Sequence, residues 1–229
     1  MRTTPALLLH GLAGHAGEWD STAAWMRERF RVVAVDGLAD AESALYDLGE
    51  PAVVVGQSLG GLIAIRLAAA RPELIRALVV AEASPSAAAD PDAFAAEVAA
   101  ALRRWPVPFP SRSAAEAFFG GPSVAASAWA SGLVERDDGL WPRFDVDAEV
   151  RMLRDAVAQS AWPDWERLSC PVLVVRGSRG TLTEAEADAM AARGRDVRVA
   201  AVPHAGHDVH LDQPEEWRRI VTEFLDSLE

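Results

Sequence analysis

The 229-residue sequence contains no lysine and a single cysteine, Cys170. Its 22 basic residues are all arginine, so no lysine is present to act as a nucleophile or to form a Schiff base. One cysteine excludes an internal disulfide and leaves too few thiols for a cysteine-based zinc site. A reducing, cytoplasmic compartment is therefore expected.

Long hydrophobic runs and clusters of positive charge are also missing. No uncharged apolar stretch reaches the roughly 18 residues of a membrane span, and the first apolar run, residues 6–9, is too short for a signal peptide. The formal net charge of -12 opposes binding to nucleic acid or to an anionic membrane. We therefore expect a small-molecule substrate as the partner, and the oligomeric state stays open.

Short, branched apolar runs alternate with helical patterns along most of the chain. Half of the residues are hydrophobic, which is enough for the core of one domain. The alternation predicts an α/β fold with a mostly parallel sheet of about six strands flanked by helices. The expected strands lie at residues 6–9, 32–35, 52–55, 77–81, 172–175 and 197–202, and the clearest helices at 59–70, 184–192 and 214–228.

Residues 85–165 interrupt this alternation. They show helical patterning without a convincing strand, so we expect a helical cap insertion within a single domain that spans residues 1–229. Aromatic side chains of the insertion either line an apolar pocket or pack the insertion onto the sheet, and packing is the commoner role. They are Trp105, Phe109, Phe118, Phe119, Trp129, Trp141, Trp162 and Trp165.

A strand predicted at 52–55 runs into Gly56-Gln57-Ser58-Leu59-Gly60 and then into a helix. Strand, Gly-x-Ser-x-Gly and helix together form the context of a nucleophile elbow, in which the serine hydroxyl stands at a helix N-terminus. Ser58 is the candidate nucleophile. The backbone amides of Leu59 and of Leu12, which lies in the glycine-rich turn after the first strand, are the candidate oxyanion donors.

Three of the five histidines, His204, His207 and His210, follow the last predicted strand. In a parallel sheet the end of that strand opens on the same edge as the elbow, so a histidine there can remove the serine proton. We assign His207 as the base. No cysteine supports a metal site in this loop, and we expect neither metal nor cofactor. His10 is interpreted as a hydrogen-bonded element of the glycine-rich turn.

These residues together resemble the α/β-hydrolase superfamily, in its compact serine esterase and lactonase branch. The resemblance implies the α/β-hydrolase fold and a Ser-His-acid triad. The usual position of the acid, in the loop after the penultimate strand, holds Gly180. Some members place the acid at the end of the strand after the nucleophile helix, where this chain has Glu82. We therefore favour Glu82 as the acid, with Glu184 or a dyad without an acid as alternatives.

The predicted function is that of a serine hydrolase that cleaves a small carboxylic ester, thioester or lactone through an acyl-enzyme. An alternative is a carbon-carbon bond hydrolase or lyase that uses the same triad, which would require arginine-rich pocket walls. A non-catalytic ligand-binding member of the fold is a third possibility.

Overall fold

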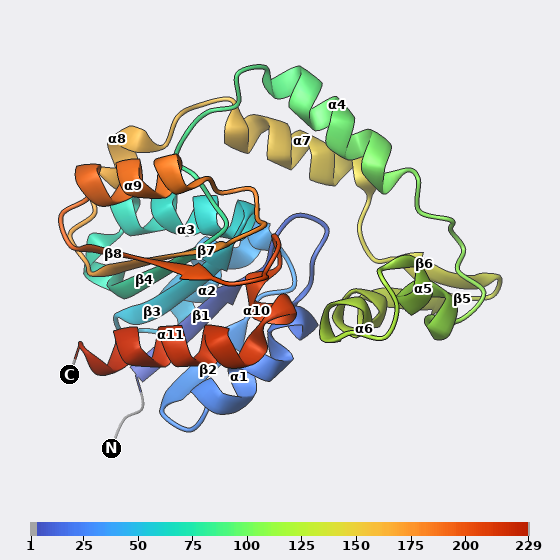
Figure 1. Ribbon diagram of the computed structural model, residues 1–229, viewed down its shortest axis with the longest axis horizontal. Coiled ribbons are helices and arrows are strands. Elements are labelled where there is room, and N and C mark those ends of the chain that lie inside the picture. The colour runs from blue at the N-terminus through green and yellow to red at the C-terminus, as the bar shows by residue number, and fades with distance from the viewer. Residues whose placement is uncertain (1–3, 229) are drawn as a thin grey trace.

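The computed structural model describes residues 4–228, which are built around a six-stranded parallel sheet in the order β2-β1-β3-β4-β7-β8 (Figure 1). Each neighbouring pair of strands is parallel. The prediction of about six mostly parallel strands is confirmed. The strands are β1 (Thr4–Leu9), β2 (Phe30–Ala34), β3 (Ala52–Gln57), β4 (Ile75–Ala81), β7 (Val172–Gly177) and β8 (Val197–Val202).

Helices cover both faces of the sheet, and for this reason its central strands are continuous apolar runs. In β3, Val54 belongs to the core on one face, whereas Val53 and Val55 belong to the core on the other. The first face is covered by α2 (Ala41–Asp47), α3 (Leu59–Ala70), α8 (Trp162–Trp165) and α9 (Glu184–Arg193), and the second by α1 (Asp20–Met26) and α11 (Pro214–Asp226). Short helical turns are η1 (Ala16–Trp19), η2 (Leu38–Asp40), η3 (Pro72–Leu74) and α10 (Val209–Asp212).

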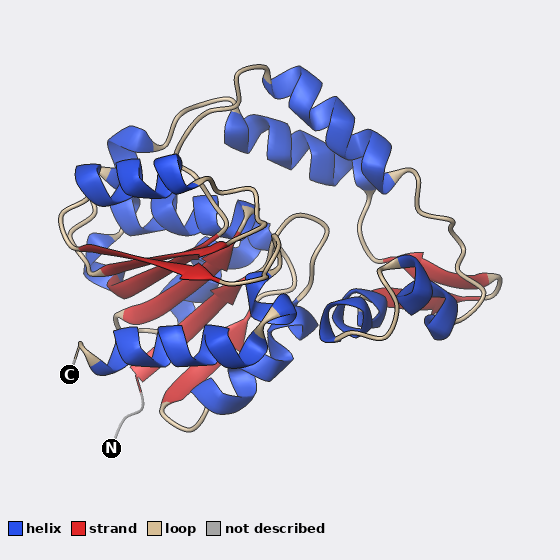
Figure 2. Cartoon of the chain, viewed as in Figure 1, coloured by secondary structure: helices blue, strands red, loops and turns tan. Residues whose placement is uncertain are grey.

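Between β4 and β7 the chain leaves the sheet. The helices α4 (Pro91–Leu102) and α7 (Val146–Val157) lie side by side over the sheet edge (Figure 1). An outer lobe contains α5 (Arg112–Phe118), α6 (Val124–Ser131) and an antiparallel hairpin of β5 (Leu133–Arg136) and β6 (Gly139–Pro142) (Figure 2). We continue to propose residues 85–165 as a cap.

The hairpin corrects the expectation that this segment contains no strand. Each of its strands has four residues, and β5 ends in the charged, exposed pair Glu135 and Arg136. Such a short strand with one buried residue, Leu133, has no alternating pattern that a sequence window detects.

Most aromatic residues of the cap pack against one another or against the domain core. Trp105 forms edge-on contacts with Phe109 and Phe119 inside the outer lobe. Trp165 is fully buried, and its indole Nε1 donates a hydrogen bond of 2.9 Å to the carbonyl of Met190. Packing is therefore the role of these residues.

Within residues 4–228, the helices are all too short or too polar to cross a bilayer.

Candidate active site

Ser58 stands at the turn between β3 and α3, where the structure gives it φ 53° and ψ -120°. Its amide donates a 2.8 Å hydrogen bond to the carbonyl of Ala81 on the neighbouring strand, which fixes this unusual backbone conformation. A Cβ atom added to Gly56 would lie 2.4 Å from the carbonyl oxygen of Gly60, and one added to Gly60 would lie 2.3 Å from that of His10. Only glycine fits on either side of the elbow.

The loop after β1 runs beside the elbow. A Cβ atom on Gly11 would lie 3.3 Å from the Cβ of Ser58, so this backbone passes directly against the serine. The two His10 ring nitrogens lie 2.6 Å from the Gly11 carbonyl and 3.3 Å from the Asp36 carbonyl, which ties the ring to the loop. Leu59 is the first residue of α3, so its amide has no acceptor within the helix.

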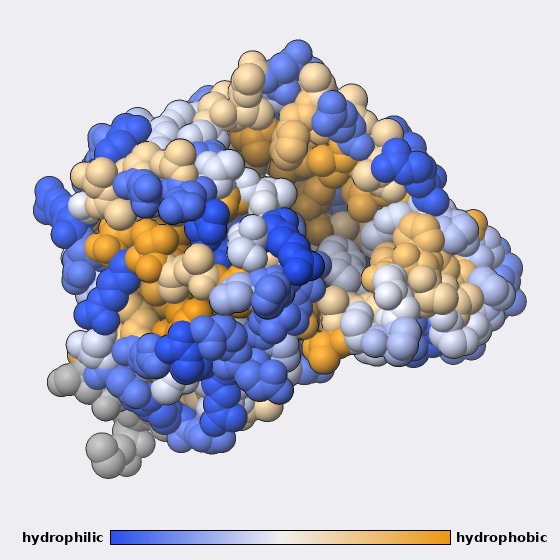
Figure 3. All heavy atoms as spheres, in the orientation of Figure 1, coloured by the Kyte–Doolittle hydropathy of each residue, from blue (hydrophilic) through white to orange (hydrophobic). Residues whose placement is uncertain are grey.

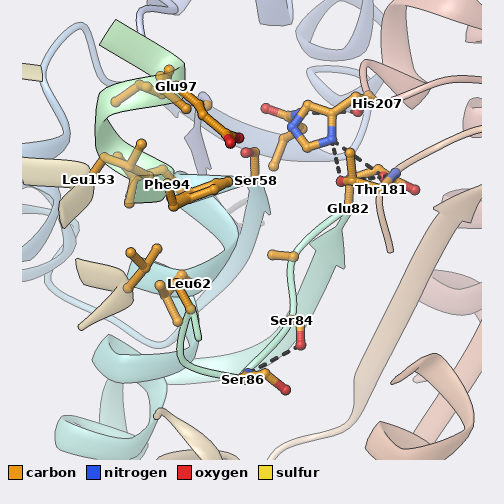
Figure 4. Close-up of a pocket in the computed structure, with 18 of the residues that line it drawn as sticks. Ser58, Leu62, Glu82, Ser84, Ser86, Phe94, Glu97, Leu153, Thr181 and His207 are labelled. Carbon is orange, nitrogen blue, oxygen red and sulfur yellow. Dashed lines mark hydrogen bonds and ion pairs between the residues drawn. The ribbon is translucent and has the colours of Figure 1, made fainter. Parts of the chain in front are cut away.

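Glu82, the residue after β4, reaches His207. Its Oε2 lies 3.3 Å from Nδ1 of the imidazole, and dashed lines mark this contact in Figure 4. The Glu82 side chain is fully buried, whereas 39% of the His207 side chain is exposed. One end of the imidazole is thus fixed inside the protein while the ring faces the same space as Ser58 (Figure 4).

Backbone amides of the loop after β7 surround the Glu82 carboxylate. Gly177 donates to Oε1 at 2.6 Å, while Thr181 and Leu182 donate to Oε2 at 2.6 and 3.1 Å. Burial raises the pKa of Glu82, but hydrogen bonds from His207 and from these three amides outweigh it, so the net pKa lies below its usual value. The group is therefore held as a carboxylate.

Gly180, the position at which the family resemblance led us to look for the acid, lies against the same carboxylate. A Cβ atom there would be 2.2 Å from Oε1 of Glu82. The carboxylate of Glu82 thus occupies the space that a side chain at residue 180 would need. The absence of a side chain at residue 180 and the position of the candidate acid Glu82 therefore depend on each other.

Thr181 is a residue of the site that sequence reasoning missed. Its hydroxyl donates to Oε2 of Glu82 at 3.2 Å and lies 2.9 Å from Nδ1 of His207. Because the hydroxyl hydrogen points to the carboxylate, its oxygen is free to accept the imidazole N–H. Thr181 therefore holds the ring together with Glu82, and its place next to Gly180 was the one signal for it in the sequence.

Ser58, His207 and Glu82 line one cavity of about 780 Å³. The cavity also contains Leu12 and Leu59, whose amides are the candidate oxyanion donors. Figure 3 shows a hollow on this face of the molecule with hydrophobic residues gathered along its wall beneath α4 and α7. The apolar side chains that line the cavity include Leu62, Phe94, Val98, Leu153 and Val157.

The model of the Alpha/beta hydrolase family matches residues 6–220. The chain belongs to this family. It is 29% identical to the 2-(acetamidomethylene)succinate hydrolase of Mesorhizobium japonicum, covering 96% of this chain and 87% of that protein. It is 34% identical to an esterase of Mycobacterium tuberculosis, covering 76% of this chain and 60% of the esterase. The solved structure of an E-2-(acetamidomethylene)succinate hydrolase matches with a TM-score of 0.82 at 24% identity, covering 98% of this chain and 92% of that one.

Glu184, the alternative acid, begins α9 of this alpha/beta hydrolase and is exposed to solvent. It does not line the cavity, whereas Glu82 does. The geometry therefore brings His207 together with Glu82 and not with Glu184.

The other two histidines of the hydrolase's last loop do not line the cavity. His210 is buried and stacks on Trp19 with ring centroids 4.1 Å apart, and burial followed by the charge of His207 lowers the pKa of His210 to about 3. His204 is exposed, and its Nδ1 lies 3.1 Å from Nη2 of Arg179. The part of the chain that the structure describes contains no cluster of three His, Cys, Asp or Glu side chains arranged to hold a metal ion.

Two other acids, Asp208 and Glu18, also line the cavity with His207. Asp208 accepts hydrogen bonds from Trp129 Nε1 at 2.9 Å and from Gln57 Nε2 at 3.4 Å, and burial raises its pKa. Glu18 is 4% exposed; burial, reinforced by the charge of Asp208, raises the pKa of Glu18 to about 8. At neutral pH Glu18 is therefore mostly protonated. Trp129 is the one cap tryptophan that reaches the cavity.

Proposed function

We propose that this alpha/beta hydrolase is a serine hydrolase that cleaves a small carboxylic ester, thioester or lactone through an acyl-enzyme. Ser58 is the nucleophile, His207 the general base and Glu82 the acid that orients it. The observation that carries the proposal is the buried Glu82 carboxylate 3.3 Å from His207 Nδ1, in one cavity with the strained Ser58 elbow.

In this mechanism His207 takes the hydroxyl proton through Nε2 as the Ser58 oxygen attacks the substrate carbonyl carbon. The amides of Leu12 and Leu59 donate to the negative oxygen of the tetrahedral intermediate. The intermediate expels the alkoxide, thiolate or ring oxygen, which receives the proton from His207. A water molecule, deprotonated by the same histidine, then attacks the acyl-enzyme and releases the carboxylic acid and Ser58.

Within residues 4–228, no hydrogen bond joins the Ser58 hydroxyl to the His207 imidazole. Catalytic hydrogen bonds of free enzymes are often long and shorten when the substrate binds. Both side chains face the cavity (Figure 4), so a carbonyl carbon bound there brings them together.

A carbon-carbon hydrolase or lyase with arginine-rich walls is less well supported. Of the described residues, no arginine lines the cavity. Three of the cap arginines bind elsewhere: Arg103 pairs with Asp147, Arg112 donates to the Ala130 carbonyl, and Arg143 pairs with Asp36. The esterase relative supports ester cleavage, and the retained elbow, base and acid argue against a non-catalytic binding protein.

The test is labelling with a fluorophosphonate probe together with hydrolysis of p-nitrophenyl pentanoate. The unmodified protein should be labelled and should release nitrophenol, and Ser58→Ala should abolish both. Ser84 lines the same cavity, so Ser84→Ala is the matched control and should keep its label. An unlabelled and inactive native protein would refute the proposal, whereas labelling without ester turnover would favour the lyase alternative.

A further inference from the structure

The cavity is acidic as well as apolar. Of residues 4–228, six acidic residues and no arginine line it; lysine is absent from the chain. The six are Glu18, Glu82, Asp90, Glu97, Glu186 and Asp208. A substrate that carries its own carboxylate would therefore find no cation to pair with and several groups of like charge.

Four of these acids are occupied by the protein itself. Glu82 is bound by His207 and the loop after β7, and Asp208 by Trp129. Asp90 caps α4 and accepts from the amide of Ala93 at 2.9 Å. Glu186 completes the capping box at the start of α9. These carboxylates are positioned by the protein's own hydrogen bonds and are not the free acceptors of the cavity.

Glu97 is different. It lies on α4 in the same helical stripe as Phe94 and Val98, which also line the cavity. Figure 4 shows its side chain projecting from α4 into the cavity toward Ser58. Within residues 4–228, no hydrogen bond or ion pair engages the Glu97 carboxylate, and the residue is exposed. An unpaired charge thus faces the position of the reacting ester.

Glu18 is the second acid of the cavity with an oxygen that no other group engages. It is 4% exposed and lines the cavity, and its Oε1 has no hydrogen-bond partner. The carboxyl is mostly protonated at neutral pH, and a positive charge bound in the cavity would favour its ionised form and give the unpartnered oxygen an interaction. Both Glu18 and Glu97 therefore favour the same kind of ligand.

We infer that the hydrolase selects its substrate by charge, accepting apolar esters that carry a positively charged ammonium group and rejecting esters that carry a carboxylate, with Glu97 as the specificity-determining residue. This inference rests on the proposed function. The apolar part of the substrate lies against Leu62, Phe94 and Leu153, and the ammonium group lies near Glu97. Selection by charge works through attraction to one class and repulsion of the other.

The experiment compares kcat/KM for three p-nitrophenyl esters of matched length. They are the neutral pentanoate, the cationic 4-(trimethylammonio)butanoate and the anionic hydrogen glutarate. The native protein should prefer the cation to the neutral ester, and the neutral ester to the anion, by about tenfold at each step, or about 1.4 kcal/mol. Both ratios should shrink as salt is raised from about 0.01 M to 1 M.

Glu97→Gln should bring both ratios to within about threefold of one. Glu73→Gln is the matched control, because it removes the same charge from an exposed residue outside the cavity, and it should leave the ratios unchanged. Equal turnover of all three esters by the native protein, or unaltered ratios in Glu97→Gln, would overturn the inference while the proposed function stands. Failure to hydrolyse any of the three esters would overturn the proposed function and, with it, the inference.

Discussion

Replacing Glu82 by glutamine tests the least conventional part of the site. The side chain of glutamine has one acceptor oxygen, whereas the two oxygens of Glu82 receive backbone N–H groups at 2.6 Å, from Gly177 on one side and Thr181 on the other. In either orientation the amide NH2 faces one of these donors. Because a hydrogen bond to a charged group contributes about 1.5–3 kcal/mol, we expect Glu82→Gln to lower the free energy of unfolding by about 2–4 kcal/mol.

The catalytic effect of Glu82→Gln should be larger in kcat than in KM, because the acid stabilises the imidazolium that forms in the transition state. Thr181 still contacts Nδ1 of His207 at 2.9 Å and retains part of the orientation. We therefore expect kcat to fall by about 100- to 1,000-fold, which is about 2.7–4.1 kcal/mol of activation free energy.

The assay is hydrolysis of p-nitrophenyl pentanoate at pH 7, with urea unfolding of the same samples to establish that the variant is folded. Glu184→Gln is the matched control, since it removes an exposed carboxylate outside the cavity, and its kcat should stay within twofold of the native value. A folded Glu82→Gln with kcat within threefold of the native protein would show that Glu82 is not the orienting acid.

Two further predictions follow from the packing of the carboxyl groups. A Cβ atom at residue 180 would lie 2.2 Å from Oε1 of Glu82, so Gly180→Ala should lower kcat by at least about tenfold. The double variant Glu82→Ala, Gly180→Asp should recover part of the activity that Glu82→Ala alone loses. A double variant as inactive as Glu82→Ala would argue that an acid at residue 180 cannot replace the acid at residue 82. In the folded state Glu18 has a pKa of about 8 and keeps its proton at neutral pH, whereas in the unfolded state it loses the proton above its usual pKa of 4.5. The free energy of unfolding should therefore fall by about 2 kcal/mol between pH 6.5 and 8. Urea unfolding should show this fall in the native protein and a flatter profile in Glu18→Gln; the same fall in both would contradict the assignment.

The sheet and the strand-turn-helix elbow at Ser58 could be predicted because their signals are local. The expected helix at 59–70 has the bounds that the structure gives to α3, and the expected strand 197–202 has those of β8. Continuous apolar runs identify strands covered on both faces, and the glycines around Ser58 reflect contacts within a few residues. Order along the chain and the parallel sheet then placed His207 at the same edge.

Contacts between segments far apart in the sequence produce no comparable local pattern in it. Thr181 meets Glu82 across 99 positions of sequence, and Trp129 meets Asp208 across 79. The orientation of Glu97 depends on how α4 lies over the sheet, which the helical pattern of the cap does not specify. The β5–β6 hairpin was missed for a related reason, since pairing between its strands and not their composition defines it.

Two adjacent strands, β3 and β4, are each followed by a residue with positive φ, 53° at Ser58 and 51° at Glu82. Each is pinned by an amide hydrogen bond to the next strand, to Ala81 from Ser58 and to Val175 from Glu82. A non-glycine residue in such a conformation costs about 1–3 kcal/mol. The proposed nucleophile and acid are thus two of the four non-glycine residues with positive φ within residues 4–228, the others being Ala13 and His204. Glycine would relieve backbone strain at each of these positions, so engineering for thermal stability by backbone preference alone would include the two substitutions that remove the chemistry.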